Sequence, residues 1–518
     1  MPNWSHHLNR KHQRNRRPGD DSSVAGNTHS LPLEIQARRI RLLLQELGPL
    51  HCCLGLYLAS RIDVLPAEFC REFALIPDAA PALTDREVHA ILNRELGGRL
   101  TTAFATFEDV PYETRLLLQV HRARLRTGAP VAVAVRRPWC AIFQQPEPLQ
   151  EIDADSRLAE YCGEWMNTAL LADFINSMQR KTDFTIAHNA MDLMARDASS
   201  CESLLSHKSY AELGTRQLVV FEPSAARPLD YILQRQVNSS TVLGQLLCQV
   251  WLQQALYGRC FPVDPHLHNI LISNKQVAFI HCDLAGLPNS AKENLQSYFN
   301  AILVDDPDQA AKHLLLEMVP GKSRVDPDAF RTNFRQAAYF GMLEPVLGTD
   351  SNALAQIAFQ HWKTALENGY LPKNHLLCFY RGLFSIARIA RLIAPEGDPL
   401  RLGMEELRST KSLDQIREIM DVRYWYQNMD KFAAVMVNLP RTFDDALSKT
   451  SSRPSAPLPQ TCDEPAGAPR EKFSVSAIVL LLLAILVMQL RTDHTEIGKV
   501  MLVALMLAGI FLFRGADD

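Results

Sequence analysis

Hydrophobic residues recur every three or four positions over residues 31–100. The pattern runs through LPLEIQARRIRLLLQELG and resumes in LTDREVHAILNREL, directly after Thr84. A repeat of this period places apolar side chains on one face of an α-helix, and a threonine just before the repeat is a favourable N-cap. We therefore predict a helical N-terminal extension over residues 31–100, with one helix beginning after Thr84.

The pattern changes to that of strands after residue 100. VAVAVRRP is rich in β-branched residues, and Gly128–Pro130 supplies a turn before it. RQLVVFEPSAARPLDYIL predicts a strand, a connection and a helix. Later segments are again mostly helical, apart from short strands around NILI and VAFIHCD. We therefore predict a small mixed lobe over residues 101–235 and a larger helical lobe over residues 236–440.

The composition is that of a folded protein, with 47% hydrophobic and 21% charged residues. The formal net charge of −3 argues against nucleic acid as a partner of the whole chain. Residues 1–30 are polar throughout and predict a disordered tail, either solvated or in contact with a polyanion such as anionic lipid. The tail is basic because it carries Arg10, Lys11, Arg14, Arg16 and Arg17. Eleven scattered cysteines without a C-x-x-C pair favour a reducing compartment.

Two apolar runs follow a linker rich in Pro, Ser and Ala, which we place at residues 441–472. Phe473–Leu490 has no charged residue and is long enough to cross about 30 Å of hydrocarbon as a helix. Val500–Phe513 is shorter, so whether it spans fully stays open. We predict a transmembrane helical hairpin over residues 473–513, with the main domain on the cytoplasmic side of the membrane. The alternative is a buried hairpin in a soluble core.

Candidate chemistry lies in FPVDPHLHNILI and in FIHCDLAG, which follows it. Asp264 and Asn269 are five residues apart, and Asp283 comes after an apolar run. This is the spacing of the catalytic aspartate, the metal-binding asparagine and the second metal-binding aspartate of kinases. Asp264 would orient a nucleophile, and Asn269 and Asp283 would hold Mg²⁺, which prefers oxygen ligands. The alternative is that all three residues only stabilise local turns and a strand end.

Four stretches together resemble the UbiB/AarF family of atypical kinase-like proteins. LGPLHCCLGLYLASRIDVLP is similar to the family's N-terminal segment with its K-x-G-Q motif, and QVHRARLRTGAPVAVAVRRP to its nucleotide loop and third strand. VDPHLHNILI resembles its D-x-H-x-G-N catalytic loop, and NAILVDDPDQAAKHLLLEMVP a helical stretch of its large lobe. With the apolar hairpin, the likeness covers most of residues 35–515.

The resemblance implies a fold, cofactors and partners. The fold class is α+β: a protein-kinase-like two-lobe fold with a helical extension over the active site and a C-terminal transmembrane hairpin. The cofactors would be Mg²⁺ with ATP or ADP. The partners would be the lipid bilayer, isoprenoid or quinone lipids and quinone-biosynthesis proteins, in a role that supports ubiquinone or related isoprenoid-lipid metabolism.

The phosphate-binding half of the family's site is missing from this sequence. The strand lysine falls at Ala134 and the helix glutamate that would pair with it falls at Ala187. Other family positions are also changed: the K-x-G-Q lysine and glutamine, the glutamate that pairs with that lysine, and the loop A-S-I-A now read Cys53, Leu56, Lys181 and Arg115–Leu118. The D-F-G triplet reads Asp283-Leu284-Ala285. Both members of each expected ion pair are absent, and such a double replacement can be nearly neutral for stability.

Three hypotheses remain. The leading one is a membrane-anchored divergent pseudokinase that supports or regulates quinone or isoprenoid-lipid metabolism. The second is an active atypical kinase or ATPase, in which Arg136, two residues after Ala134 on the same face of a strand, would contact phosphate in place of the lysine. The third is a small-molecule kinase of the aminoglycoside or choline-kinase type, which shares the D-x-x-x-x-N loop but would not explain the hairpin.

Overall fold

The structure is a computed structural model that describes residues 32–144, 168–235, 240–321, 327–339 and 353–420. The predicted basic tail, linker and apolar hairpin lie outside these ranges. Within them, no helix combines the length and the apolar character needed to cross a membrane. All described residues belong to one compact unit, which ends at Tyr424.

In the described part of the predicted helical extension lie α2 (Leu33–Leu47), α3 (Pro49–Leu58), α4 (Ala67–Phe73) and α5 (Asp85–Leu96). Thr84 caps α5 as predicted, because its hydroxyl accepts from the Glu87 backbone N–H while the Glu87 carboxylate accepts from the Thr84 N–H at 2.9 Å. Helices α2–α4 pack into the large core, whereas α5 packs on the sheet of the small lobe.

The small lobe is built on an antiparallel sheet in the order β1-β3-β4-β5, with β2 also pairing with β3. A short helix, α6 (Arg99–Ala103), leads into it. The strands are β1 (Phe104–Phe107), β2 (Glu113–Thr114), β3 (Leu118–Leu125), β4 (Pro130–Arg136) and β5 (Leu218–Phe221). The predicted turn joins β3 to β4, and Gly128 takes the left-handed φ of 87° that suits glycine.

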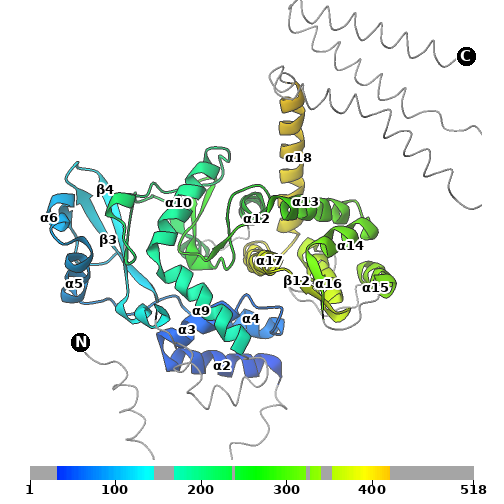
Figure 1. The fold of residues 1–518 in the computed structure, drawn as a ribbon, viewed down its shortest axis with the longest axis horizontal. Coiled ribbons are helices and arrows are strands. Elements are labelled where there is room, and N and C mark those ends of the chain that lie inside the picture. Colours follow the sequence, from blue (N-terminus) through cyan, green and yellow to red (C-terminus); the bar gives the residue numbers. More distant parts are fainter. Residues whose placement is uncertain (1–31, 145–167, 236–239, 322–326, 340–352, 421–518) are drawn as a thin grey trace, which may run out of the picture. The chain divides into compact units, whose positions relative to one another are not determined.

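The two faces of β4 pack against different helices. Val131, Val133 and Val135 form a cluster with α5, whereas Ala132 and Ala134 form one with α10 (Phe184–Ala198). This alternation is the two-residue period that the sequence predicts. Between β4 and α10 come the 3₁₀ helix η2 (Pro138–Gln144) and α9 (Thr168–Thr182), as Figure 1 shows.

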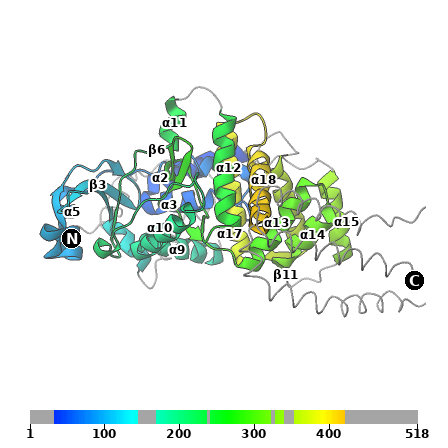
Figure 2. The same cartoon turned by 90° about the horizontal axis from the view of Figure 1, so that it is seen from above.

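The large lobe is mostly helical, as predicted. In the described part it contains α11 (Leu229–Arg235), α12 (Thr241–Leu256), α13 (Asn289–Leu303), α14 (Pro307–Leu316), α15 (Pro327–Tyr339), α16 (Leu354–Glu367), α17 (Asn374–Ile393) and α18 (Pro399–Met420). Helix α12 lies beside α17 and α18 (Figure 2). The rings of Trp251, Phe261 and Phe379 meet in the core between them, with centroids 5.4 to 6.2 Å apart.

Short strands flank the kinase-like loop: β6 (Arg227–Pro228), β7 (Phe261–Pro262), β8 (Ile270–Ser273), β9 (Gln276–Phe279) and β10 (Leu284–Ala285), with the 3₁₀ turn η5 (Leu267–Asn269) inside it. Elsewhere, β11 (Met318–Pro320) pairs with β12 (Tyr370–Pro372), and the 3₁₀ turn η4 (Ala211–Leu213) packs on β5. Because β7 pairs antiparallel with β10, the residue that follows β7 lies beside the residue that precedes β10. The result is the predicted α+β, kinase-like order of a small mixed lobe and a larger helical lobe.

Candidate functional site

Asp264 lies two residues after β7 and is buried. One carboxylate oxygen accepts a hydrogen bond from the Asp283 backbone N–H at 2.9 Å, and the other forms an ion pair with Lys181 Nζ. Burial would lower the pKa of Lys181, but the Asp264 carboxylate outweighs burial and the pKa is raised. The candidate catalytic oxygen is therefore already bound to an internal cation.

Asp283 is held in the same way by a different cation. Arg180 donates to both carboxylate oxygens, at 2.9 and 2.7 Å, and the Ser177 hydroxyl donates to one of them at 2.8 Å. Burial would raise the pKa of Asp283, but the bidentate arginine lowers it overall. Both oxygens that would bind a metal ion are thus occupied by guanidinium N–H groups.

Asn269 ends the short turn η5, and its side-chain oxygen accepts a hydrogen bond from Arg115 at 2.7 Å. Arg115 also donates to the backbone oxygen of His268 and forms ion pairs with Asp78, at 3.2 Å, and with Glu113. Arg115 comes from the small lobe, just before β3. One arginine therefore ties the small lobe to the kinase-like loop of the large lobe.

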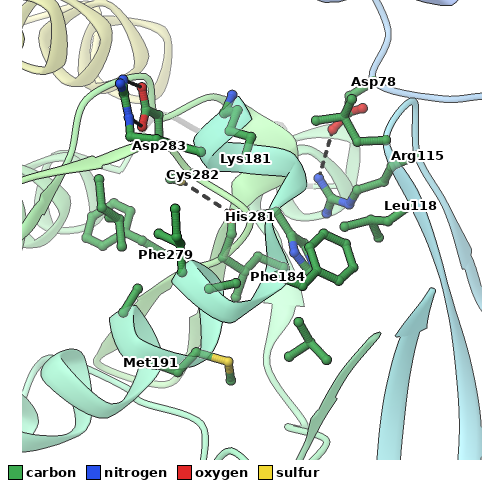
Figure 3. A pocket seen from close by; sticks show the side chains of 18 of the residues that line it. Asp78, Arg115, Leu118, Lys181, Phe184, Met191, Phe279, His281, Cys282 and Asp283 are labelled. Atoms are coloured by element: carbon green, nitrogen blue, oxygen red, sulfur yellow. Dashed lines mark hydrogen bonds and ion pairs between the residues drawn. The ribbon is translucent and has the colours of Figure 1, made fainter. Parts of the chain in front are cut away.

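The last turn of α9 supplies two of the three cations. Arg180 and Lys181 lie there next to each other, where the negative end of the helix dipole favours basic residues. The helix ends at Thr182 because Asp183 caps α10, its carboxylate accepting from the Thr185 N–H at 3.1 Å. The end of α9 is thus held beside Asp264 and Asp283, and Figure 3 shows Lys181 and Asp283 next to each other in its upper part.

The positions of the missing lysine and glutamate meet in an apolar cluster. Ala134 on β4 is 0% exposed and packs in one cluster with Phe184 and Val219, against which Ala187 of α10 also packs. Positions 134 and 187, which the family resemblance expects to form an ion pair, therefore lie in the same cluster of the structure. Both positions carry alanine methyl groups, so neither offers a positive charge that could bind a phosphate group.

A second pair of family positions also meets. A cavity lies between the sheet of the small lobe, α10 and the segment after β9, and Cys53 and Leu56 on α3 line it. Lys181, which stands where the resemblance places a glutamate, lines the same cavity. Burial raises the pKa of Cys53 well above its usual value, so this thiol stays neutral. The charge that the family would place on α3 is thus absent, and the charge at position 181 is reversed and paired with Asp264.

Arg136 does not line the cavity. It lies at the end of β4, where its guanidinium donates to the backbone oxygen of Thr182, the last residue of α9, at 3.0 Å. In this arrangement it supports the C-terminal end of α9. Its role as a phosphate contact stays a prediction, which requires the side chain to turn away from Thr182.

The predicted metal ligands do not fit a magnesium ion as they are arranged here. The predicted ligands Asn269 and Asp283 lie together with the predicted catalytic residue Asp264, but their oxygens accept from Arg115 and from Arg180, and Asp264 accepts from Lys181. An ion at this point would meet three positive charges. Among the residues that the structure describes, no group of three or more His, Cys, Asp and Glu side chains is arranged to hold a metal.

The sequence interpretation missed the three partners. In the sequence, Arg115 was identified only as part of the changed loop and Lys181 only as a replaced glutamate, and Arg180 was not identified. Asp78, the partner of Arg115, was also missed. The signal that would have found Arg180 and Lys181 is a pair of basic residues at the end of a predicted helix. No pattern in the sequence points to Asp78, which lies in the connection between α4 and α5.

The comparisons with known proteins point to the family that the sequence resembles. Residues 75–314 match the model of the ABC1 atypical kinase-like domain. A probable protein kinase UbiB of Azotobacter vinelandii is 25% identical over 385 residues, which cover 70% of this chain and 69% of that protein. A second one, from Sodalis glossinidius, is 26% identical over 395 residues and covers 70% and 68% respectively.

A solved structure is also similar, at a greater distance. The complex of Rv3197 with erythromycin from Mycobacterium tuberculosis has a TM-score of 0.39 and 16% sequence identity, and covers 65% of this chain and 90% of that one. At this distance the likeness supports no argument about the site. The domain model covers two of the four stretches that carry the resemblance in the sequence and most of a third, the one that begins at Asn300. Residues 75–314 thus carry an ABC1 atypical kinase-like domain, and the chain is similar to the UbiB proteins of the UbiB/AarF family over about 70% of its length.

Proposed function

We propose that the chain is a pseudokinase of the UbiB-like family: a kinase-like scaffold that has replaced its metal-dependent chemistry with internal ion pairs. One observation carries the proposal. Asp264, Asn269 and Asp283 each bind a cationic side chain of the same chain, so the site is complete without a metal ion. The apolar contact at Ala134 and Ala187 removes the other half of the family's phosphate site.

The charges around the loop balance without a ligand. Four cations lie in the region, Arg115, Arg180, Lys181 and Arg381, of which Arg381 acts on both aspartates from α17. They face four carboxylates, those of Asp78, Glu113, Asp264 and Asp283. Because breaking one buried ion pair costs about 3–5 kcal/mol, a magnesium nucleotide would have to displace several favourable contacts before binding.

The proposal also includes a location and a cellular role, and both are taken from the family resemblance. The protein would be anchored in the inner or cytoplasmic membrane by residues 473–513, with the main domain cytoplasmic. It would support or regulate ubiquinone or isoprenoid-lipid metabolism through contacts with those lipids or with the proteins that make them. The two apolar runs and the family resemblance support this part of the proposal.

The test is to measure ATP hydrolysis and nucleotide binding with the purified full chain in detergent. We expect no magnesium-dependent hydrolysis above that of an Asp264→Asn control, and no more than weak binding of a fluorescent ATP analogue. Restoring the lysine alone, as Ala134→Lys, should not produce turnover, since Ala187 offers it no partner. Hydrolysis that requires magnesium and disappears in Asp264→Asn would contradict the proposal.

An active atypical kinase or ATPase is the second candidate, because one observation favours it. Lys181 and Arg180 line the cavity beside Asp264 and Asp283, so two cations are near the place where phosphates would bind if these pairs opened. In that case Lys181→Met should abolish hydrolysis. If Arg136 is the phosphate contact, Arg136→Ala should do so too. Under the pseudokinase proposal both variants match the unchanged protein in this assay.

A further inference from the structure

One face of the small-lobe sheet carries two arginines in a row. Residues directly opposite each other on paired strands lie on the same face, so Arg122, opposite Ala132, belongs to the face that Ala132 shares with α10. Arg124 lies two residues further along β3 and therefore on that face too. Helix α5 covers the other face, and Figure 1 shows α5 and α10 on opposite sides of these strands.

Helix α10 covers only part of this face. On β3 the apolar cluster between the sheet and α10 ends at Val120, and the next two residues on that face, Arg122 and Arg124, are exposed. The strand is still paired on both sides there, because Arg124 lies opposite Thr106 of β1 and Pro130 of β4. The two arginines are therefore presented to the solvent by a strand that its neighbours hold in place.

Neither arginine has an acidic partner in the part of the chain that the structure describes. Arg122 lies over the ring of Tyr112, 5.2 Å from its centroid. Arg124 donates to the backbone oxygen of Gly128 at 3.3 Å. Both positive charges are thus open to a carboxylate from outside, whereas Arg115, Arg180 and Lys181 are already paired.

Exposed apolar surface lies beside the arginines. Tyr112 is 44% exposed, and Val110, which precedes β2, is 78% exposed. Tyrosine and arginine are enriched at the centre of protein interfaces, where the ring supplies contact area and the guanidinium binds carboxylates in a fixed geometry. This combination favours a protein segment as the partner over a small anion.

The spacing of the arginines matches that of an extended polypeptide. Residues two apart on a strand are separated by about 6.6 Å, and the same distance separates alternate side chains of an extended peptide. Acidic residues at alternate positions of such a peptide would meet Arg122 and Arg124 in turn. Each guanidinium offers a carboxylate two parallel hydrogen bonds.

Acidic side chains next to the arginines argue against a polynucleotide as the partner. Glu108 and Asp109 are exposed just before Val110, and the Glu108 backbone N–H donates to the Arg122 backbone oxygen at 2.9 Å. A nucleic-acid backbone carries a negative charge on every unit and would be repelled by these carboxylates. A peptide can place an uncharged or basic residue opposite them.

We propose that Val110, Tyr112, Arg122 and Arg124 form a docking surface for an extended acidic segment of a partner protein, with carboxylates at alternate positions. The inference deepens the proposed function and rests on it, because a chain that supports metabolism without catalysis acts through contacts with other molecules. The surface lies on the small lobe beyond the apolar cluster with α10, so docking requires no change at Asp264, Asn269 or Asp283.

The test uses two fluorescein-labelled peptides of identical composition and the purified full chain in detergent. One peptide carries three glutamates at alternate positions separated by threonine, and in the other the glutamates are three positions apart. Fluorescence anisotropy measures the Kd of each. We expect the alternating peptide to bind at least about tenfold more tightly, because only its carboxylates reach both arginines together. Equal affinity of the two peptides, or no binding of either, would contradict the proposal.

Charge reversal identifies the residues that bind. Arg122→Glu combined with Arg124→Glu should weaken binding of the alternating peptide by at least about tenfold and abolish its preference over the other peptide. The matched control is Arg39→Glu combined with Arg86→Glu, at exposed positions of α2 and α5, which should keep that preference. If the first variant does not fold, Arg122→Gln with Arg124→Gln replaces it, with the same expected loss. An equal loss in the control would show an effect of net charge alone and would overturn the docking surface.

A short oligonucleotide of deoxythymidine tests the other class of partner in the same assay. It should bind more weakly than the alternating peptide, and tighter binding would overturn the peptide in favour of nucleic acid. None of these measurements involves ATP. Magnesium-dependent ATP hydrolysis would overturn the pseudokinase and leave the peptide affinities as measured, whereas failure of the peptides to bind would overturn the docking surface alone.

Discussion

At the scale of single residues, three basic side chains of the same chain bind the side chains that carry the kinase-like spacing. Asn269, Asp264 and Asp283 retain the spacing of a catalytic loop, and the sequence was enough to bring them together. The sequence was not enough to say what they bind, because Arg115, Arg180 and Lys181 reach them from distant segments. Such contacts depend on tertiary packing, which the local pattern does not encode.

Arg115 gives the first prediction at this scale. Arg115→Ala removes the bonds to Asn269 and His268 and leaves the Asp78 carboxylate, whose side chain is only 12% exposed, without its arginine. We expect the free energy of unfolding to fall by about 3–5 kcal/mol, because a buried charge loses its partner. Urea denaturation of the purified full chain measures the change.

Its control is Arg86→Ala, on the exposed side of α5, which should stay within about 0.5 kcal/mol of the original. Asp78→Asn in the Arg115→Ala background should recover part of the loss, since the stranded charge is then gone. A loss below about 1 kcal/mol for Arg115→Ala would show that the contact between the lobes contributes little to stability.

At the scale of elements, helices and strands followed the hydrophobic pattern closely. Thr84 caps its helix, Gly128 turns the chain between β3 and β4, and β4 alternates between two clusters as its sequence indicates. The pattern did not reveal that α5 packs on the sheet while α2–α4 join the large core. Both kinds of helix are amphipathic, so their periodicity alone does not distinguish the surfaces that they cover.

Helix α17 packs against the segment that leads into the kinase-like loop. The lack of a side chain at Gly382 allows α17 to approach Trp251 and Pro262 closely. A Cβ atom there would lie 2.6 Å from the Trp251 ring and 2.7 Å from the backbone oxygen of Pro262. That oxygen accepts from the Trp251 indole at 2.9 Å, two residues before Asp264. We expect Gly382→Ala to lower the free energy of unfolding by about 1–3 kcal/mol through overpacking.

Gly98→Ala is the matched control in the same urea experiment. No atom lies within 4 Å of a Cβ built at Gly98, and its φ of −61° is open to alanine. We expect no loss there and a gain of up to about 1 kcal/mol from the reduced entropy of the unfolded chain. Equal effects of the two substitutions would mean that α17 shifts easily and that Gly382 does not fix the position of the loop.

At the scale of the whole molecule, the order of a small mixed lobe and a large helical lobe was predictable, and so was the loss of the family's phosphate site. The sequence did not predict that some histidine side chains are buried inside the fold, where burial lowers their pKa. His361 on α16 is an example: it is 2% exposed, its ring stacks on Phe334 at 3.9 Å, and Nδ1 is 3.1 Å from the Tyr298 hydroxyl. A histidine in a helical repeat looks the same in sequence whether it is buried or exposed.

This burial makes stability depend on pH in a direction that can be worked out. Burial lowers the pKa of His361 to about 3, whereas the unfolded chain has a value of about 6.5. The unfolded state therefore binds the proton more tightly between these values. The contribution of His361 is fully present above pH 6.5 and is lost progressively as the pH falls towards 3.

The resulting prediction compares urea denaturation at pH 7.5 and at pH 5.0, followed by tryptophan fluorescence, since Trp362 is adjacent. At about 1.4 kcal/mol per pH unit, His361 alone should lower the free energy of unfolding at pH 5.0 by about 2 kcal/mol relative to pH 7.5. His361→Leu loses the Tyr298 hydrogen bond at both pH values but should reduce the difference between them by that amount. If the difference is the same in both proteins, His361 is able to take up a proton in the folded state, and its environment in the large lobe is more open to water than its packing against Phe334 indicates.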